Sequence, residues 1–171
     1  MSDMGREKVK SSALFERGLL SEFSASVLPN NINGATAIPL ATTPTTLAAL
    51  ANTSAIRVNS VNDRVWLTGT VGWRAVTPAT VGRVDVMFRI WRTAPITGTL
   101  IFSTLDSAAA LDIDQTTSFI HVDLTPVLTP GQHIVPYYLT AELPLTGSAA
   151  TIIGPITFTA AEIEPNRCGC P

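Results

Sequence analysis

The two cysteines of the chain, Cys168 and Cys170, stand one residue apart near its carboxyl-terminal end. A disulfide between them is disfavoured, because a relaxed bridge needs Cα atoms about 5.5 Å apart and a dihedral angle near ±90°. Three interpretations remain: idle reduced thiols in a cytosol, metal ligands, or disulfides to other subunits. We favour intermolecular disulfides, because the rest of the chain offers these thiols no other cysteine.

Histidines and clustered acids give weak signals for metal binding or catalysis. His121 and His133 would complete a Cys₂His₂ set, but their spacing matches no zinc module. Asp106, Asp112 and Asp114 lie close together without the spacing of an EF-hand, so solvated turn residues are the simpler interpretation. The chain has neither a Gly-x-Ser-x-Gly nucleophile turn nor a glycine-rich phosphate loop. We therefore expect no catalytic residue, no metal, no cofactor and no enzymatic activity.

Three aromatic residues are candidates for surface binding. Trp66, Trp91 and Tyr138 each fall on the side of an expected strand opposite its main apolar set. Such aromatic residues are either covered by a neighbouring subunit or available to a ligand such as a sugar. A one-residue shift in register would exchange the two faces and remove the signal.

The elements that must position these residues are strands. In the stretch Arg64–Val76, apolar residues alternate with polar ones, the period-two pattern of an antiparallel strand with one buried face. A bulge is expected at Gly154-Pro155, because proline cannot donate to a strand ladder. In residues 118–124, Ile120, Val122 and Leu124 share one side and His121 lies on the polar side. Further strands are expected at residues 35–40, 47–51, 55–61, 81–92, 99–104, 118–124, 133–143 and 150–163.

This series of short strands with proline- or glycine-marked turns predicts the fold class. We expect an all-β protein, an antiparallel β-sandwich of the jelly-roll type, with an N-terminal arm. The arm carries Phe15, Leu19 and Phe23 at a spacing of four, which would place them on one helix face, and they are the expected subunit-docking residues. Helical, extended and disordered conformations all remain open for the arm. The expected domains are an arm (1–28), a β-sandwich (29–164) and a cysteine-containing tail (165–171).

Charge and hydropathy exclude two classes of partner. The chain has 11 basic and 13 acidic residues, so it lacks the excess of lysine and arginine that nucleic-acid binding requires. No apolar stretch approaches the ~18 residues of a membrane-spanning helix. The first residues have no apolar segment behind their charges, so we expect no secretion signal and synthesis in a cytosol.

Three stretches carry a resemblance to a known group of proteins. NDRVWLTGTVGW (62–73), the hairpin FRIWR…LIFST (88–104) and AATIIGPITFTA (149–160) resemble small β-sandwich proteins of the spore surface of Firmicutes. Those proteins belong to the exosporium, the spore coat or endospore appendages, and the resemblance implies a jelly roll similar to tumour necrosis factor and C1q. The absence of a Gly-x-y repeat argues against a collagenous stalk. The resemblance also implies release to an oxidising exterior after lysis of the mother cell.

Two functions are therefore expected to compete. The first is a structural, self-assembling subunit of a spore surface layer or appendage, linked through arm docking and intermolecular disulfides. Its partners would be copies of itself and other spore-surface proteins, since the low charge gives little self-repulsion. The alternative is a trimeric binding module similar to C1q or tumour necrosis factor that recognises glycan or protein.

Overall fold

The computed structural model describes residues 19–28, 37–76, 82–109, 114–126, 133–146 and 148–165. Within those ranges the chain is mostly β-strand, and no helix is long and apolar enough to cross a membrane. A single 3₁₀ turn, η1, covers Asn52–Ser54. The strands are β1 (Leu19–Val27), β2 (Ile38–Pro39), β3 (Thr45–Leu50), β4 (Ile56–Arg57), β5 (Arg64–Val76), β6 (Val84–Arg92), β7 (Thr99–Ala108), β8 (Asp114–Asp123), β9 (Ile134–Val135), β10 (Tyr137–Glu142) and β11 (Ala149–Glu164).

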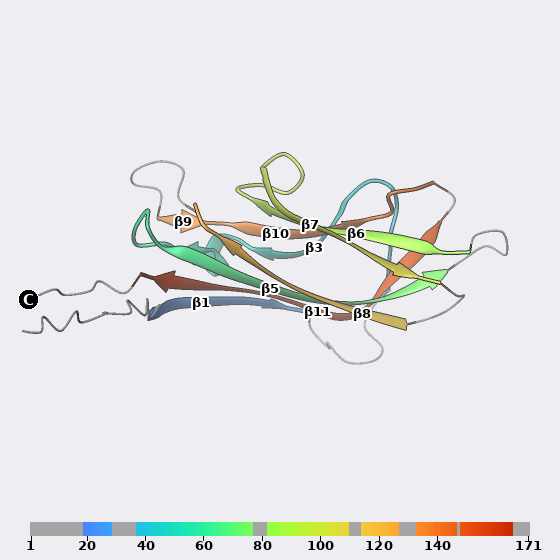
Figure 1. The fold of residues 1–171 in the computed structure, drawn as a ribbon, viewed down its shortest axis with the longest axis horizontal. Helices are drawn as coiled ribbons and strands as arrows, with labels where there is room; N and C mark the ends of the chain where they lie inside the picture. Colours follow the sequence, from blue (N-terminus) through green and yellow to red (C-terminus); the bar gives the residue numbers. More distant parts are fainter. Residues whose placement is uncertain are drawn as a thin grey trace, which may run out of the picture.

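The long strands form two antiparallel sheets packed face to face (Figure 1). One sheet has the order β1-β11-β5-β8, with β2 added to β11, and the other has the order β3-β10-β6-β7. Strands β4 and β9 form a small separate pair. Consecutive long strands repeatedly change sheets, and the eight of them give the two-sheet jelly-roll arrangement. The predicted all-β, jelly-roll sandwich is confirmed.

The core lies between the two sheets because the alternation in the strands directs one set of side chains inward. In β5, Leu67 and Trp73 are fully buried, and in β6 Phe88 and Ile90 face them from the other sheet. Phe158 in β11 is also fully buried. Burial of such side chains contributes about 1.5–3 kcal/mol each, so the alternation fixes which face of each strand points inward.

The predicted bulge in β11 is present where expected. The register between β5 and β11 shifts between Ile152 and Ile156, and Gly154 there has a φ of 83°, a conformation that glycine adopts without strain. On β5, Gly72 lies directly against this bulge: a Cβ atom at that position would stand 1.8 Å from the carbonyl oxygen of Gly154. The two strands can therefore approach this closely only because residue 72 has no side chain.

The sandwich includes a stretch that the sequence analysis assigned to the arm. Leu19–Val27 is strand β1, an edge strand that pairs antiparallel with β11 of the same chain. Of the three conformations left open for the arm, this part is extended rather than helical. A bulge between Leu20 and Glu22 places Leu20, rather than Leu19, on the same face as Phe23, so the expected sharing of one face by Leu19 and Phe23 is wrong. Phe15 lies outside the described residues.

Strand β8 presents the opposite face to the one expected. Ile120 and Val122 share one side, as predicted, but that side is exposed, at 63% and 40%. Phe119 and His121 point toward the other sheet instead, and each ring lies within 6 Å of Phe102, at centroid distances of 5.4 and 5.3 Å. The expectation that His121 lies on the polar, outward side is therefore wrong, because aromatic packing against β7 decides the orientation.

Candidate assembly surface

The outer face of the β1-β11-β5-β8 sheet is built from three rows of residues that are register partners across the four strands. We call it the Trp66 face. The rows are Phe23, Ala161, Trp66 and Val122; Ala25, Thr159, Thr68 and Ile120; and Val27, Thr157, Thr70 and Ser118.

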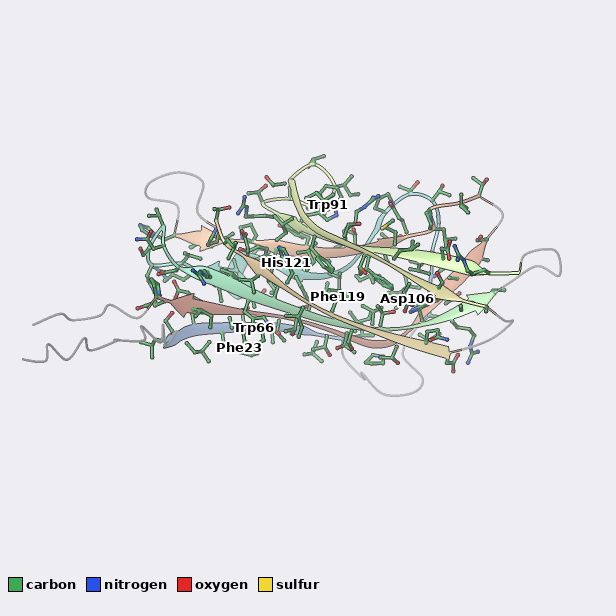
Figure 2. All side chains as sticks on the ribbon, viewed as in Figure 1. Phe23, Trp66, Trp91, Asp106, Phe119 and His121 are labelled. Carbon is green, nitrogen blue, oxygen red and sulfur yellow. The ribbon has the colours of Figure 1, made fainter. Side chains whose placement is uncertain are left out.

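Several large apolar side chains of the Trp66 face are exposed. Trp66 is 46% exposed and Phe23 is 60% exposed, and both point away from the other sheet (Figure 2). In the adjacent row the threonine hydroxyls bond to each other: Oγ1 of Thr68 lies 2.6 Å from Oγ1 of Thr159. An exposed apolar patch of this kind is typical of an interaction site, because water contacts it unfavourably.

A shallow apolar hollow marks one end of the Trp66 face. Its volume is about 370 Å³, and aromatic rings from β1 and β5 stand beside aliphatic groups of β11. It therefore joins the edge strand to the centre of the sheet. The residues that line it are Leu20, Phe23, Trp66, Thr68, Thr159, Ala161 and Ile163.

None of the residues that define the Trp66 face is charged. Charged groups appear only beyond its rows: Arg64 next to Ile163 at one end, and Arg74 with Asp114 at the other. Nε of Arg74 lies 2.6 Å from a carboxylate oxygen of Asp114, and its hydrogen bond lowers the pKa of that carboxyl below the usual value. A partner that covers the face would therefore leave these charges in water at the rim.

On the outer face of the other sheet, β6 and β10 carry mostly polar side chains. We call it the Trp91 face: Met87, Arg89, Trp91, Tyr138, Thr140 and Glu142. The indole Nε1–H of Trp91 donates to Oγ1 of Thr140 at 2.9 Å, and Arg89 forms an ion pair with Glu142. Thr140 is almost completely covered. Most polar groups of this face are paired, although Nε of Arg89 has no hydrogen-bond partner among the described residues. Its exposed apolar residues lie on β7, where Leu100 and Leu105 are each 46% exposed beside Trp91 and Met87.

The three predicted surface aromatics therefore do not form one site. Trp91 and Tyr138 are register partners on the Trp91 face, and both are half-buried. Trp66 lies on the opposite side of the sandwich, as Figure 2 shows. Of the predicted docking residues, Leu19 and Phe23 are exposed on β1, and only Phe23 lines the hollow beside Trp66. Phe15, Cys168 and Cys170 lie outside the described residues.

Of the predicted histidine and aspartate candidates, His133 and Asp106 have structural partners, and Asp112 lies outside the described residues. Nδ1 of His133 lies 3.3 Å from the carbonyl oxygen of Val58. Asp106 accepts a hydrogen bond from the hydroxyl of Thr117, and that hydroxyl accepts one from the indole of Trp73 at 2.9 Å. This chain links β7, β8 and β5 across the open side of the sandwich. Among the described residues, no group of three potential metal ligands comes together.

A buried polar cluster, which we call the Asp123 cluster, was not anticipated from the sequence. Asp123 accepts hydrogen bonds from Nη1 of Arg92 at 2.8 Å and from the hydroxyl of Tyr137 at 2.9 Å. Burial and the neighbouring carboxylate raise the pKa of Tyr137 far above its usual range, so it stays protonated and donates. One signal in the sequence could have revealed that Arg92 is buried: it continues the alternate, inward-facing positions of Phe88 and Ile90 in β6.

A carboxyl pair, Asp63 and Glu162, is buried near the start of β5. Glu162 accepts hydrogen bonds from the backbone N–H and side-chain amide of Asn59, at 2.6 and 3.0 Å, and from the hydroxyl of Ser21. Asp63 accepts the backbone N–H of Ser60 at 2.6 Å. Burial raises the pKa of Asp63, and the hydrogen bond with Glu162 raises it further, so Asp63 holds a proton more tightly here than in the unfolded chain.

This pair predicts a pH-dependent stability difference. Between the unfolded pKa of Asp63 and its raised folded pKa, the folded protein binds more protons than the unfolded chain, so stability from this group is lost as pH rises through that interval. Asp63→Asn keeps an oxygen for the Ser60 N–H but removes the buried charge. We expect the variant to have a higher free energy of unfolding than the wild type at about pH 7, with the difference shrinking toward about pH 4.

Urea denaturation of both proteins at several pH values measures this difference. Asp85 and Asp114, whose pKa values are lowered by hydrogen bonds from Ser107 and Arg74 respectively, contribute an opposite slope at more acidic pH. That slope is common to both proteins and cancels in the comparison. A difference that stays constant with pH would contradict the raised pKa of Asp63.

Comparisons with known proteins add little to these observations. No protein-family model and no curated protein matches the chain. One similar solved structure is described as "Structure of infectious bursal disease virus Gx strain", with a TM-score of 0.33 and 10% sequence identity. The match covers 86% of this chain and 42% of that one, so this chain spans less than half of that protein. At that TM-score the likeness carries no information on function, and the Trp66 face rests on the contacts of the chain itself.

Proposed function

We propose that the protein is a structural subunit that assembles with copies of itself. The observation that carries this proposal is the Trp66 face, where Trp66, Phe23 and Ile120 are largely exposed and no defining residue is charged. Monomeric proteins rarely leave such a patch in water unless something binds to it. The described ionisable groups that are buried hold the sandwich together through ion pairs and hydrogen bonds, which suits a structural role.

Cysteines at the end of the chain provide a second means of association. Cys168 and Cys170 follow Glu164, the last residue of β11, by only a few positions. Thiols close to an exposed surface form intermolecular disulfides when an oxidant is present. The assembly we propose therefore combines contact through a sheet face with covalent links through the tail, and Phe23 on β1 supplies the docking contribution expected of the arm.

Oxidation of the purified full chain tests this function. We expect a ladder of higher-mass species on non-reducing gels that collapses to 18.1 kDa when a thiol reductant is added. A Cys168→Ser/Cys170→Ser variant should lose the ladder while keeping its fold by circular dichroism. A band at the monomer mass in every condition, with no association in sedimentation velocity, would overturn the proposal.

The setting that we propose for this assembly follows the sequence resemblance to spore-surface proteins of Firmicutes. A layer or appendage on a spore faces oxidant after release, which suits disulfide-linked subunits. Immunogold labelling of intact spores with an antibody to the chain would test that location. Label confined to the spore interior would contradict it without affecting the assembly experiment.

A second candidate function is the recognition of glycan or protein by a binding module. Its specific support is the adjacency of Trp91 and Tyr138 across β6 and β10. Since the indole N–H of Trp91 is already bonded to Thr140, a ligand would have to use the ring faces. A glycan array that is positive for a narrow sugar class and loses its signal in Trp91→Ala would favour this function over assembly.

A further inference from the structure

We infer that the Trp66 face is the contact between two copies of the chain, which pack sheet against sheet about a two-fold axis that runs roughly along the strands. This inference rests on the proposed self-assembly and names the surface and geometry through which it happens. Figure 2 shows Phe23 and Trp66 together on the side of the sandwich away from the other sheet.

A second copy fits the Trp66 face because the face is complementary to itself. A two-fold contact brings each patch against the same patch, so any charge within it would meet a like charge near the axis. Residues from Phe23 across to Val122 are uncharged, and so are those in the two rows beside them. The nearest charges, Arg64 and the Arg74–Asp114 pair, lie outside the rows and stay at the rim.

The area of the Trp66 face limits the strength of the contact between two copies. Four strands about 4.8 Å apart and five residues at about 3.4 Å each give roughly 330 Å² of flat area per copy. Two copies would bury about 650 Å², below the ~1,000 Å² at which stable specific interfaces begin and in the range of weak, transient contacts. The contact on its own is therefore reversible, and the dimer should depend on protein concentration when the thiols are reduced.

The direction of the axis follows from where the chain leaves the sheet. Stacked sheets keep their strand directions within about 30° of each other, which permits an axis nearly parallel to the strands. Rotation about such an axis leaves β11 running the same way in both copies, so both Glu164 residues come to the same end. Cys168 is four residues beyond Glu164, a reach of at most about 14 Å, so the two tails can meet.

Sedimentation velocity of the reduced full chain over a concentration series tests the contact. The wild type should pass from monomer to dimer, and Trp66→Glu should weaken the dimer at least about tenfold, because a charge would be buried against its own copy. Ile120→Glu, on edge strand β8, is a second variant that is less able to disturb folding. Leu105→Glu is the matched control, since Leu105 is also 46% exposed but lies on β7 of the other sheet.

A wild type that stays monomeric when reduced, or a dimer that Trp66→Glu and Ile120→Glu leave unchanged, would overturn this interface. Phe15→Glu tests whether the residues near Phe15, rather than the sheet of a second copy, cover the Trp66 face. If they did, this variant would change the association state as Trp66→Glu does. With a second copy as occupant, Phe15→Glu should behave like wild type. A change in Phe15→Glu of the same size as in Trp66→Glu would reject the two-copy contact.

Disulfide formation tests the direction of the axis. If the tails meet at one end, contact through the Trp66 face raises the effective concentration of the thiols, and Trp66→Glu should slow the appearance of the oxidised dimer at least about tenfold. An unchanged rate would overturn the axis along the strands. If the reduced protein is monomeric but oxidation still produces the ladder of higher-mass species, the interface through the Trp66 face is rejected and the proposed function stands. No association in either condition would reject both.

Discussion

Replacing Arg92 with methionine is expected to lower the free energy of unfolding by about 3–5 kcal/mol. The side chains of Arg92 and Asp123 are each only 5% exposed, and the guanidinium is the cation that compensates the buried carboxylate. Without it, Asp123 keeps the hydroxyl of Tyr137 and a backbone N–H but no opposite charge. Urea denaturation under reducing conditions, at a concentration where the protein is monomeric, measures the loss.

Two further variants show whether burial is the cause. Arg92→Met/Asp123→Asn removes both charges and should recover at least half of the loss, because no uncompensated ion is left inside. Arg74→Met breaks an ion pair with Asp114 whose side chains are 45% and 56% exposed, and should cost less than about 1 kcal/mol. Equal losses in Arg92→Met and Arg74→Met would contradict the assignment of Arg92 to the core.

Gly72→Ala is expected to destabilise the sandwich by about 3 kcal/mol, the upper end of the usual range for overpacking. The added Cβ would stand 1.8 Å from the carbonyl oxygen of Gly154 and 2.3 Å from its carbonyl carbon. Both atoms belong to the backbone of β11 and cannot rotate aside as a side chain would. The central pair of the β1-β11-β5-β8 sheet would have to separate locally, and thermal or urea denaturation would report the cost.

Gly82→Ala is the control for the loss of glycine flexibility. A Cβ atom at Gly82 meets nothing within 4 Å, so this variant should stay within about 0.5 kcal/mol of the wild type. Both substitutions restrict the unfolded chain in the same way, and only Gly72→Ala adds a clash in the folded state. Near-equal stabilities for the two variants would disprove the close approach of β5 and β11.

The sequence predicted the strands whose apolar residues alternate, and the reason is physical. In β5 every second residue from Val65 to Ala75 is buried, so the hydrophobic effect acts on a pattern that can be read directly. The bulge at Gly154-Pro155 was predicted for a similar reason, since the demands of proline on backbone hydrogen bonding are local. Strand pairing across the two sheets is not local, and its order came only from the structure.

Prediction failed where apolar residues face water. The alternation in residues 118–124 predicts an apolar side with Ile120 and Val122 and a polar side with His121, but the apolar side is the exposed one. Strand β1 was missed because its apolar residues are exposed and the spacing of four between Leu19 and Phe23 is that of one helix face. The same exposed apolar residues make up much of the Trp66 face, so the errors and the candidate site have one origin.

The candidate site was predicted only in part. Trp66 and Phe23 were singled out separately, as a surface aromatic and as a docking residue, and the structure places them in one hollow. The contribution of Ala161 was missed, although Thr157, Thr159 and Ala161 alternate with the buried Phe158 and Ala160. Residues from four strands far apart in the sequence meet here, and no local pattern reports their neighbours across the sheet.

The Trp91 face is more polar than the Trp66 face, and this difference limits how an assembly of this chain can grow. Another sheet would have to desolvate the ion pair between Arg89 and Glu142 and the bonded indole of Trp91, and the exposed leucines that the structure describes on this face lie only on edge strand β7. If only the Trp66 face pairs, each molecule contacts one other copy through sheet packing, and stacking stops at two sandwiches. A polymer would then need the two thiols of each chain as further points of connection, so a variant with a single cysteine should terminate growth that the wild type continues.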